Sequence, residues 1–476
     1  MLEPVAVPLI VLVLLLGGCL YGLVVRPLWR RRSERRNTHA FHEAQGRLAI
    51  QPSAFQLLKP TSTADLLMVD PLVQDAILKE TERSEADQCD ALVEARTYAR
   101  EIVPSLSAGL YFRIIHGPVK RMMLSLFRVR VRYVDEEALV QAARTSTPVF
   151  VLNHRSNLDY VIAATSLADR AILSFAVGEW ARYWPLEGLL RALGGFFVRR
   201  GSGNPLYRAV LAAHVKTATH AGVPQAFFIE GRFSEDGKLR RPRLGLLDYA
   251  VRAFDPEAAR DVAFVPVAVN YDRVIEDKNL QIMKASGKRA TRFGSWRATA
   301  AFLGHQVWLR LNRRWKPFGH ATLSVGAPIS LREWLASREF DPRAAERDKR
   351  FEEVGVLADH LMGRIADIMP VLPVPLMAAV IRNRGNGGVT RDEARNAAFK
   401  ILESLTSRPG EPDIPREDWD PAVELGLQLL IQRRMVRTEE GRLRILEPRR
   451  HFVDYYANTI DHLLSTGSAK PLASAG

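Results

Sequence analysis

Residues 148–160 read PVFVLNHRSNLDY, a short apolar run that passes directly into a polar segment. Five consecutive apolar residues without polar alternation are typical of a strand buried on both faces. Three later runs repeat the pattern, at Gly195–Val198, Ala226–Ile229 and Val262–Val269, with helical segments between them. Residues Phe127–Val134 alternate instead, as in a half-exposed strand. Strands separated by helices predict an α/β domain with a largely parallel sheet.

Polar side chains follow three of these apolar runs. His154 comes after the first run, Arg199 and Arg200 after the second, and Glu230 and Arg232 after the third. Ligands of open α/β sheets bind at the carboxyl ends of the strands. We therefore expect these side chains to form a single site.

His154 and Asp159 are five positions apart, and a bend between them would bring the two side chains together. A carboxylate in contact with an imidazole fixes its tautomer and stabilises its protonated form. Such a pair suits removal of a proton from a substrate hydroxyl, with no nucleophile from the enzyme. Taken alone, the spacing is also compatible with an exposed histidine near a helix-capping aspartate.

Several familiar chemistries are excluded by the sequence. It contains neither a Gly-x-Ser-x-Gly elbow nor a His-Glu-x-x-His zinc helix. Residues 231–238 are one residue too long for a phosphate-binding loop of nucleotide triphosphatases, and Leu239 stands where that loop needs Ser or Thr. The two cysteines, Cys19 and Cys89, cannot form a disulfide framework or a cysteine zinc site. We expect neither a metal nor a cofactor.

The chain is basic in two places only. It has 476 residues and a formal net charge of +14. Arg26–Arg36 carries a net +5 and Arg273–Lys316 a net +9, which together equal the whole excess. The charge therefore indicates two basic patches and bears on partners more than on fold.

The N-terminal segment Val5–Val25 contains 21 residues without a charge. As a helix it would be about 31 Å long, close to the roughly 30 Å of a bilayer core. The arginines follow the apolar run, whereas a signal peptide carries them before it. We predict a transmembrane anchor over residues 1–28 with the rest of the chain on the cytoplasmic face of the cell membrane. A lipoprotein cleavage site ending at Cys19 and a buried core helix are the alternatives.

The second basic segment has an aromatic stripe at helical spacing. The stripe consists of Trp296, Ala300, Leu303, Val307, Leu311 and Trp315, with four arginines around it. A helix of this kind suits the headgroup region of anionic lipid. A core-packed helix with a solvated charged side fits equally well. Nothing in the sequence resembles a nucleic-acid-binding motif, and we expect no nucleic acid as a partner.

The flanking regions are predicted to be mostly helical. Residues 29–126 form the first, with a break near Pro60, and the α/β domain occupies residues 127–335. The second covers residues 336–476, with a loop over Pro409–Pro421 and a hairpin over Met435–Leu446. Within it, Thr390 and Glu393 are spaced as a capping box.

Four blocks follow one another in order, at Asn153–Tyr160, Gly194–Arg200, Phe228–Arg232 and Val265–Arg273. Together they resemble the glycerophospholipid acyltransferase superfamily, most of all the glycerol-3-phosphate and dihydroxyacetone-phosphate acyltransferases. Weaker similarities lie outside the blocks, at Asp70–Gln74, Glu101-Ile102, Gly203–Tyr207 and Asp454–Leu464. The resemblance covers most of residues 70–465 and is sharp over about 150–275.

This resemblance implies a division of labour at the site. His154, paired with Asp159, would deprotonate the 1-hydroxyl of glycerol 3-phosphate, which then attacks an acyl thioester. Arg200 would bind the phosphate, as would the third block with Glu230 and Gly231. Pro266 would serve the acyl donor or the local structure. The full set of substrate-binding candidates is Arg155, Ser156, Gly194, Arg200, Glu230, Gly231, Arg232, Ser234, Arg243 and Pro266.

The third block departs from the family pattern Glu-Gly-Gly-Arg-Ser-Arg-Thr-Gly. Here it reads Glu230-Gly-Arg-Phe-Ser-Glu-Asp-Gly237, so Phe233 and Glu235 replace two arginines. Either Arg232 and Arg243 together supply the phosphate contact, which we favour, or the acceptor is not a small phosphate.

Three functions are therefore compatible with the sequence. The first is a membrane-anchored glycerol-3-phosphate 1-O-acyltransferase that uses acyl-CoA or acyl carrier protein and associates with anionic membrane lipid. The second is an acyltransferase for lysophosphatidate or another lipid alcohol. The third is a non-catalytic membrane scaffold, against which the intact His154/Asp159 pair argues.

Overall fold

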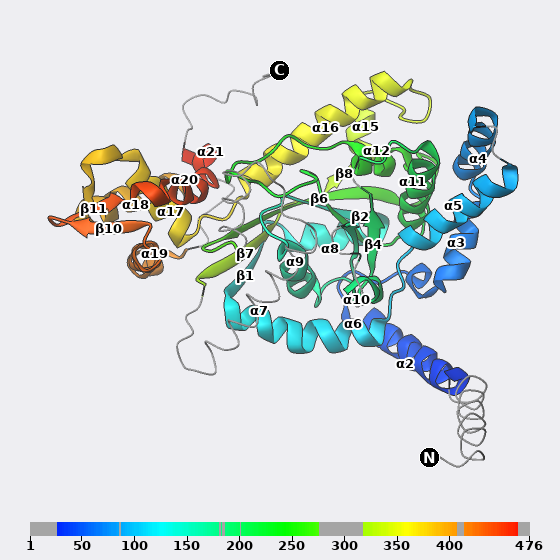
Figure 1. The fold of residues 1–476 in the computed structure, drawn as a ribbon, viewed down its shortest axis with the longest axis horizontal. Coiled ribbons are helices and arrows are strands. Elements are labelled where there is room, and N and C mark those ends of the chain that lie inside the picture. The colour runs from blue at the N-terminus through cyan, green and yellow to red at the C-terminus, as the bar shows by residue number, and fades with distance from the viewer. Residues whose placement is uncertain are drawn as a thin grey trace, which may run out of the picture.

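The computed structural model describes residues 26–84, 87–179, 182, 186–199, 201–275, 318–406 and 414–464. An eight-stranded sheet lies at its centre, between an N-terminal group of helices and a C-terminal helical region at the opposite end (Figure 1). The apolar run Val5–Val25 and the aromatic stripe from Trp296 to Trp315 lie outside the described residues. Of the helices that the structure describes, none combines the length and the apolar character needed to span a bilayer.

The central sheet has the strand order β1-β7-β6-β2-β5-β3-β4, and β8 pairs with β6. The strands are β1 Arg128–Tyr133, β2 Ser146–Leu152, β3 Ser174–Gly178, β4 Gly195–Val198, β5 Gln225–Phe228, β6 Asp261–Tyr271, β7 His320–Val325 and β8 Ile329–Ser330. The pairs β6–β7 and β6–β8 are antiparallel, whereas the other pairs are parallel. The carboxyl ends of β2 to β6 and the start of β7 therefore share one edge.

The five strands expected from the sequence are present, and the α/β prediction is confirmed. Val149 to Leu152 of β2 are 0–1% exposed, as its unbroken apolar run requires. β1 is an edge strand with exposed arginines, in keeping with its alternating sequence. The sequence reading missed β3 and β7, because Ser174–Gly178 and His320–Val325 mix polar and small residues with the apolar ones.

Helices make up the N-terminal region and flank the sheet. Those before and within the sheet are α2 Arg26–Arg47, α3 Pro60–Met68, α4 Pro71–Ser84, α5 Gln88–Ile102, α6 Ala108–Ile114, α7 Lys120–Leu126, α8 Glu136–Thr145, α9 Asp159–Leu167, α10 Leu186–Ala192, α11 Pro205–His220 and α12 Gly245–Arg252. The five-residue π-helix Ile115–Val119 joins α6 to α7 and contains Pro118. A second apolar cluster lies where α3, α4 and α5 pack on α11 and on Phe196 of β4.

The C-terminal region is helical with a small sheet of three strands. Its elements are α15 Leu331–Ser337, α16 Arg347–Asp367, α17 Pro373–Asn383, β9 Val389–Thr390, α18 Arg391–Leu405, α19 Trp419–Gln432, β10 Val436–Glu439, β11 Arg442–Ile445, α20 Arg450–Asn458 and α21 Asp461–Leu464. The hairpin turn at Glu440-Gly441 and the capping box of Thr390 with Glu393 are confirmed. The loop placed at Pro409–Pro421 ends earlier than expected, because α19 accommodates Pro421 in its first turn.

The C-terminal region shares its hydrophobic core with the α/β domain. One buried cluster contains Phe264 of β6, Leu361 of α16, Met377 of α17 and Tyr456 of α20. Helix α15 crosses the boundary that we expected between residues 335 and 336. The two regions therefore fold against each other as one packed body.

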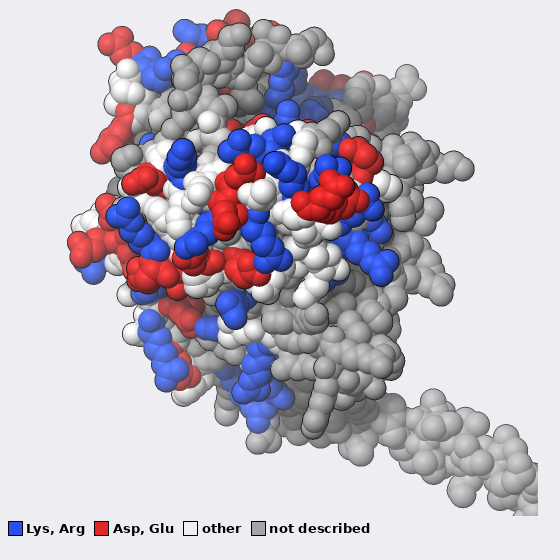
Figure 2. All heavy atoms as spheres, turned by 90° about the vertical axis from the view of Figure 1, so that its left-hand side faces the viewer, with Lys and Arg blue, Asp and Glu red and all other residues white. Residues whose placement is uncertain are grey.

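The outer face of the C-terminal region mixes charges of both signs (Figure 2). Ion pairs join neighbouring elements there, such as Arg395 with Asp420 and Arg391 with Glu424. On the face drawn, basic and acidic side chains alternate over short distances. The described residues of this face therefore form no single-sign patch of the kind that binds a polyanion.

The crossing of α17 and α19 gives a stability test, because it depends on Gly426. An added Cβ at Gly426 would lie 2.4 Å from the carbonyl oxygen of Pro373. We expect Gly426→Ala to destabilise the protein by about 1–3 kcal/mol, since overpacking outweighs the gain of about 1 kcal/mol in helix propensity. Thermal or urea unfolding of the full chain measures this change.

Gly363 in α16 is the matched control. A Cβ there would have no neighbour within 4 Å. Gly363→Ala is therefore expected to be neutral or to stabilise the protein by up to about 1 kcal/mol. Equal effects of the two substitutions would contradict the close helix contact.

Candidate active site

The bend after β2 brings His154 and Asp159 together. Asn153 closes the strand end, donating from Nδ2 to the Val269 carbonyl at 3.0 Å and accepting the Val269 N–H at 2.7 Å. The chain then turns, and Asp159 begins α9. His154 Nδ1 lies 2.8 Å from Asp159 Oδ2. Because a carboxylate only accepts, Nδ1 carries the proton and Nε2 of the neutral ring carries the lone pair.

Asp159 is fully buried and is surrounded by donors. Besides His154, its Oδ2 accepts the backbone N–H groups of Arg155 at 2.6 Å and Ser156 at 2.9 Å. Its Oδ1 accepts the hydroxyl of Tyr271, at the end of β6, at 2.5 Å. Four donors offset the large cost of taking a carboxylate out of water. They also fix the direction in which the carboxylate holds the imidazole.

The imidazole of His154 lies between two aromatic rings. It stacks on Phe228 with ring centroids 4.0 Å apart and meets the edge of Phe233 at 5.7 Å. Only 5% of His154 is exposed. The ring is therefore held in one orientation by packing as well as by its bond to Asp159.

Glu230 ties the third block to His154. Its Oε1 accepts the backbone N–H of His154 at 3.0 Å, and its Oε2 accepts the backbone N–H of Arg240 at 3.0 Å. Burial raises the pKa of the Glu230 carboxyl, while Arg155 and the two N–H groups oppose the shift. Both carboxylate oxygens thus serve to hold the loop of residues 230–243 against the strand end.

A cavity of about 710 Å³ opens along this loop. Five cationic and three acidic side chains are among its lining residues, which are Glu230, Arg232, Glu235, Asp236, Lys238, Leu239, Arg240, Arg241, Pro242 and Arg243. The structure thus brings Arg232 and Arg243 to one cavity. Gly231 makes this possible, since it has φ +68° and an added Cβ would lie 3.0 Å from Arg243 Cγ. Guanidinium groups that line a cavity suit a phosphate.

Three of the candidate residues are buried and bond within the protein. Arg155 is 1% exposed and donates from Nη1 to the carbonyls of Gly237 at 2.5 Å and Lys238 at 3.3 Å. Ser156 contributes its N–H to Asp159, and Ser234 donates its N–H to the His154 carbonyl at 3.0 Å. These residues shape the site and do not line the cavity.

Gly194 and Pro266 lie away from the cavity. Gly194 lies at the amino end of β4, whereas His154 follows the carboxyl end of β2. An added Cβ at Gly194 would lie 2.8 Å from the Leu173 carbonyl oxygen. Pro266 is inside β6, between the residues paired with β8 and those paired with β7. Proline cannot donate an N–H to a neighbouring strand, and on this side of β6 neither β7 nor β8 pairs with Pro266. The structure therefore does not bring these two candidates to the base.

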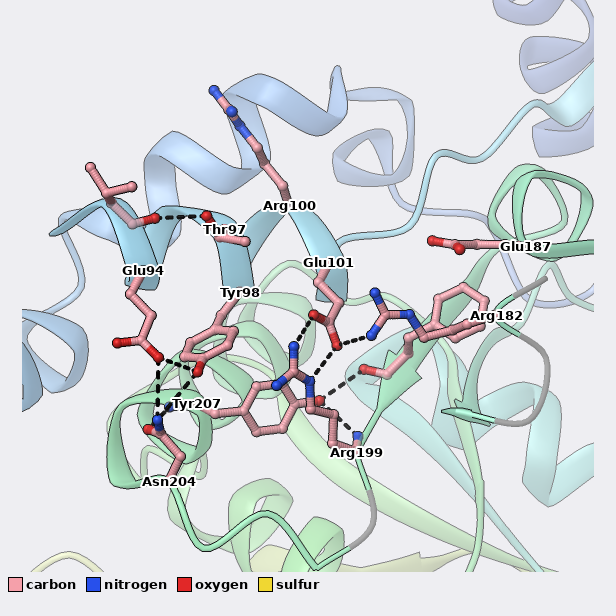
Figure 3. Close-up of polar contacts among 12 residues, drawn as sticks. Glu94, Thr97, Tyr98, Arg100, Glu101, Arg182, Glu187, Arg199, Asn204 and Tyr207 are labelled. Carbon is pink, nitrogen blue, oxygen red and sulfur yellow. Dashed lines mark hydrogen bonds and ion pairs between the residues drawn. The ribbon is translucent and has the colours of Figure 1, made fainter. Parts of the chain in front are cut away.

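Of the two arginines that follow β4, the structure describes Arg199, whereas Arg200 lies outside the described residues. Arg199 turns to Glu101 of α5, donating from Nε at 2.8 Å and from Nη2 at 2.5 Å (Figure 3). Its guanidinium also lies over the rings of Tyr98 at 4.9 Å and Tyr207 at 5.2 Å. Arg199 is thus held by the N-terminal helices, contrary to the expected single site.

Glu101 is the centre of this second cluster. It is 7% exposed and also accepts Arg182 Nη1 at 2.6 Å, so two guanidinium groups share one carboxylate. Tyr207 accepts the backbone N–H of Arg199 at 2.8 Å. These contacts fix the chain at the end of β4 (Figure 3). The buried pairing of Glu101 is a contact between distant segments, which a local pattern does not reveal.

Sequence reasoning also missed Tyr271 and three cavity-lining cations. Tyr271 falls inside the fourth block, but nothing local indicates that its hydroxyl reaches Asp159. The cations are Lys238, Arg240 and Arg241. Their density after the altered third block was the available signal, since four of the six residues in Lys238–Arg243 are basic.

Two family models match the chain. The acyltransferase model matches residues 130–270, and the model of the glycerol-3-phosphate acyltransferase C-terminal region matches residues 308–469. A glycerol-3-phosphate acyltransferase of Pseudomonas syringae pv. syringae is 26% identical over 419 residues, which are 84% of this chain and 48% of that protein. The enzyme of the same name from Pseudoalteromonas atlantica is 27% identical over 411 residues, with coverages of 83% and 48%.

The chain thus spans about half the length of these relatives. Among solved structures, the 1-acyl-sn-glycerophosphate acyltransferase of Thermotoga maritima matches 64% of this chain and 94% of its own, with 16% identity and a TM-score of 0.31. The two family models cover both the α/β domain and the C-terminal region described above. Residues 130–270 therefore match the acyltransferase family and residues 308–469 match the C-terminal region of glycerol-3-phosphate acyltransferases, in agreement with the resemblance of the four blocks.

Proposed function

We propose that the protein transfers a fatty acyl group from an acyl thioester to the 1-hydroxyl of glycerol 3-phosphate. The product is lysophosphatidate, made in the first step of phospholipid synthesis. One observation carries the proposal, namely a buried His154–Asp159 pair whose backbone is tied through Glu230 to the cation-lined loop. The acceptor has a hydroxyl and a phosphate, which match the base and the loop.

His154 acts as the general base. Its Nε2 takes the proton of the 1-hydroxyl while Asp159 stabilises the imidazolium that forms. The alkoxide oxygen attacks the thioester carbonyl and forms the new C–O bond. When the tetrahedral intermediate collapses, the C–S bond breaks, and the thiolate takes the proton from the imidazolium. Proton and charge therefore balance without a covalent enzyme intermediate.

Arg232 and Arg243 bind the acceptor phosphate, together with Arg200. Both Arg232 and Arg243 are exposed and line the cavity next to Glu230, so they are accessible to a dianion. Planar guanidinium groups make paired contacts with phosphate oxygens. Arg155, Ser156 and Ser234 support the base and the loop from within. Either acyl-CoA or acyl carrier protein supplies the thioester.

The N-terminal apolar run anchors the protein in the cell membrane. Val5–Val25 is long enough to span a bilayer, and the arginines of Arg26–Arg36 follow it on the cytoplasmic side. Anionic lipid is then a partner of the basic segments. The acyl product remains at the membrane surface where it is made.

A transfer assay tests the reaction. Purified full-length protein in vesicles, given a palmitoyl thioester and radiolabelled glycerol 3-phosphate, is expected to make lysophosphatidate, and His154→Ala to lose at least about 1,000-fold in kcat. Tyr271→Phe removes one of four donors to Asp159 and should lower kcat by about 5- to 10-fold.

The assay needs both classes of acyl donor, the palmitoyl thioester of CoA and that of acyl carrier protein. Transfer to lysophosphatidate but not to glycerol 3-phosphate would replace the proposed acceptor. A His154→Ala variant as active as the wild type would remove the base from the mechanism.

The phosphate contacts give a second test. Arg232→Ala and Arg243→Ala are each expected to raise the acceptor KM by about 10-fold or more and to leave the donor KM nearly unchanged, because each removes a charge-assisted hydrogen bond. Arg200→Ala should behave in the same way. Arg395→Ala is the control, since Arg395 pairs with Asp420 on the outer face of the C-terminal region. Unchanged acceptor kinetics in all three variants would reject the phosphate assignment.

The anchor is tested by extraction of cell membranes. The full chain should stay in the pellet after alkaline carbonate treatment, because a spanning helix resists removal of electrostatic contacts. Complete release by carbonate or by high salt would show that the association is peripheral.

A further inference from the structure

The C-terminal region contacts the cation-lined loop of residues 230–243 at its tip, which is Asp236 and Gly237. Asn458, the last residue of α20, donates from Nδ2 to the Asp236 carbonyl at 2.9 Å. Next to it, Gly237 is buried with φ +86°, and an added Cβ would lie 1.9 Å from the Tyr455 carbonyl oxygen. Residues more than 200 positions apart thus meet without space for a side chain between them.

The amide of Asn458 has a fixed orientation. Arg382, near the end of α17, donates from Nη1 to Asn458 Oδ1 at 2.7 Å and from Nη2 to Asp461 Oδ1 at 2.5 Å. A guanidinium only donates, so the Asn458 oxygen must face Arg382. The Asn458 NH₂ then faces the Asp236 carbonyl. Each hydrogen bond from Arg382 through Asn458 to the loop is therefore donated toward the loop.

Asp236 connects this contact with the active site. Its Oδ1 accepts the Ser234 hydroxyl at 3.1 Å and the Lys238 N–H at 3.0 Å. Ser234 in turn donates its N–H to the His154 carbonyl. On the other side, Arg155 donates to the Gly237 carbonyl. The tip of the loop is thus held from the α/β domain by Arg155 and from the C-terminal region by Asn458.

We propose that Asn458 and Arg382 are positioning residues for the acceptor phosphate. The loop residues that follow the tip carry Lys238, Arg240 and Arg243, so the position of the tip sets where these cations meet the ligand. This inference rests on the proposed function and gives the C-terminal region a part in acceptor binding. It acts on the binding of glycerol 3-phosphate, while His154 keeps its own contacts with Asp159 and Glu230.

The substitution Asn458→Asp tests the proposal with almost no change in shape. A carboxylate keeps the contact with Arg382 but cannot donate to the Asp236 carbonyl. We expect the acceptor KM to rise by about 5-fold or more, with kcat and the donor KM within about 2-fold of the wild type, since one neutral hydrogen bond is lost and two acceptors face each other. Arg382→Met, which removes the donors that orient Asn458, should shift the same parameter in the same direction.

Two controls separate positioning from general destabilisation. Arg395→Gln removes an ion pair elsewhere in the C-terminal region and should change none of the kinetic constants. Thermal unfolding of each variant measures stability. An unchanged acceptor KM in both Asn458→Asp and Arg382→Met overturns the proposal. So does a parallel change in kcat and both KM values with a lowered melting temperature.

A binding measurement keeps this test independent of turnover. Calorimetric titration of glycerol 3-phosphate into His154→Ala and into His154→Ala/Asn458→Asp compares affinity without catalysis. A higher Kd in the double variant supports the inference, even if the wild type shows no acyl transfer. In that case only the proposed reaction fails. Equal Kd values in the two proteins overturn the inference while the reaction stands.

Discussion

The buried carboxylate of Asp159 is the group on which the site depends. Its two oxygens accept four hydrogen bonds, from the His154 ring, two backbone N–H groups and the Tyr271 hydroxyl. A carboxylate at 0% exposure would be strongly destabilising with fewer donors. The bonds that offset this cost are the same bonds that shape the turn after β2 and orient the His154 ring. Local structure and chemistry are therefore set by one group.

The end of β6 extends this control to the C-terminal region. Tyr271 donates to Asp159, and the next residue, Asp272, is also fully buried. Asp272 accepts the His320 N–H at 2.7 Å, lies 3.0 Å from His320 Nδ1 and accepts the Val374 N–H of α17 at 2.7 Å. Consecutive strand residues point to opposite faces. Tyr271 therefore supports the His154–Asp159 pair, and its neighbour Asp272 fixes the start of the helix that carries Arg382.

Much of the α/β domain could be predicted because its signals are local. Apolar runs gave β2, β4, β5 and β6, and the spacing of His154 and Asp159 gave the central pair. What the sequence could not provide are contacts between distant segments. The Tyr271–Asp159 bond joins residues 112 positions apart, and Glu101 binds Arg199 from 98 positions away. The prediction that Arg199 belongs to the same site as His154 was wrong for this reason. Strand ends that share one side of the sheet can still direct their side chains to different places.

The contact between the C-terminal region and the loop was equally hidden. Asn458 and Asp236 are 222 positions apart, and neither lies in a motif that indicates the other. Gly237 was recognisable only as part of the third block, although its close approach to Tyr455 explains why a side chain cannot be accommodated there. Packing between distant regions thus determines which residue fits at a position such as Gly237, and the motif alone does not give the reason.

The altered third block has a physical consequence of its own. Phe233 occupies a position where the family commonly has arginine, and its ring meets the His154 imidazole edge-on at 5.7 Å. A cation at that place would repel the imidazolium that the proposed reaction forms on His154. The basic residues of this chain instead follow the loop tip, from Lys238 to Arg243, along the cavity. In the proposed reaction, the positive charge for the acceptor is thereby separated from His154, and the loop must be held rigidly for the two to act on one substrate. That requirement is met by Glu230 at one end of the loop, by Arg155 beneath its tip and by Asn458 from the C-terminal region.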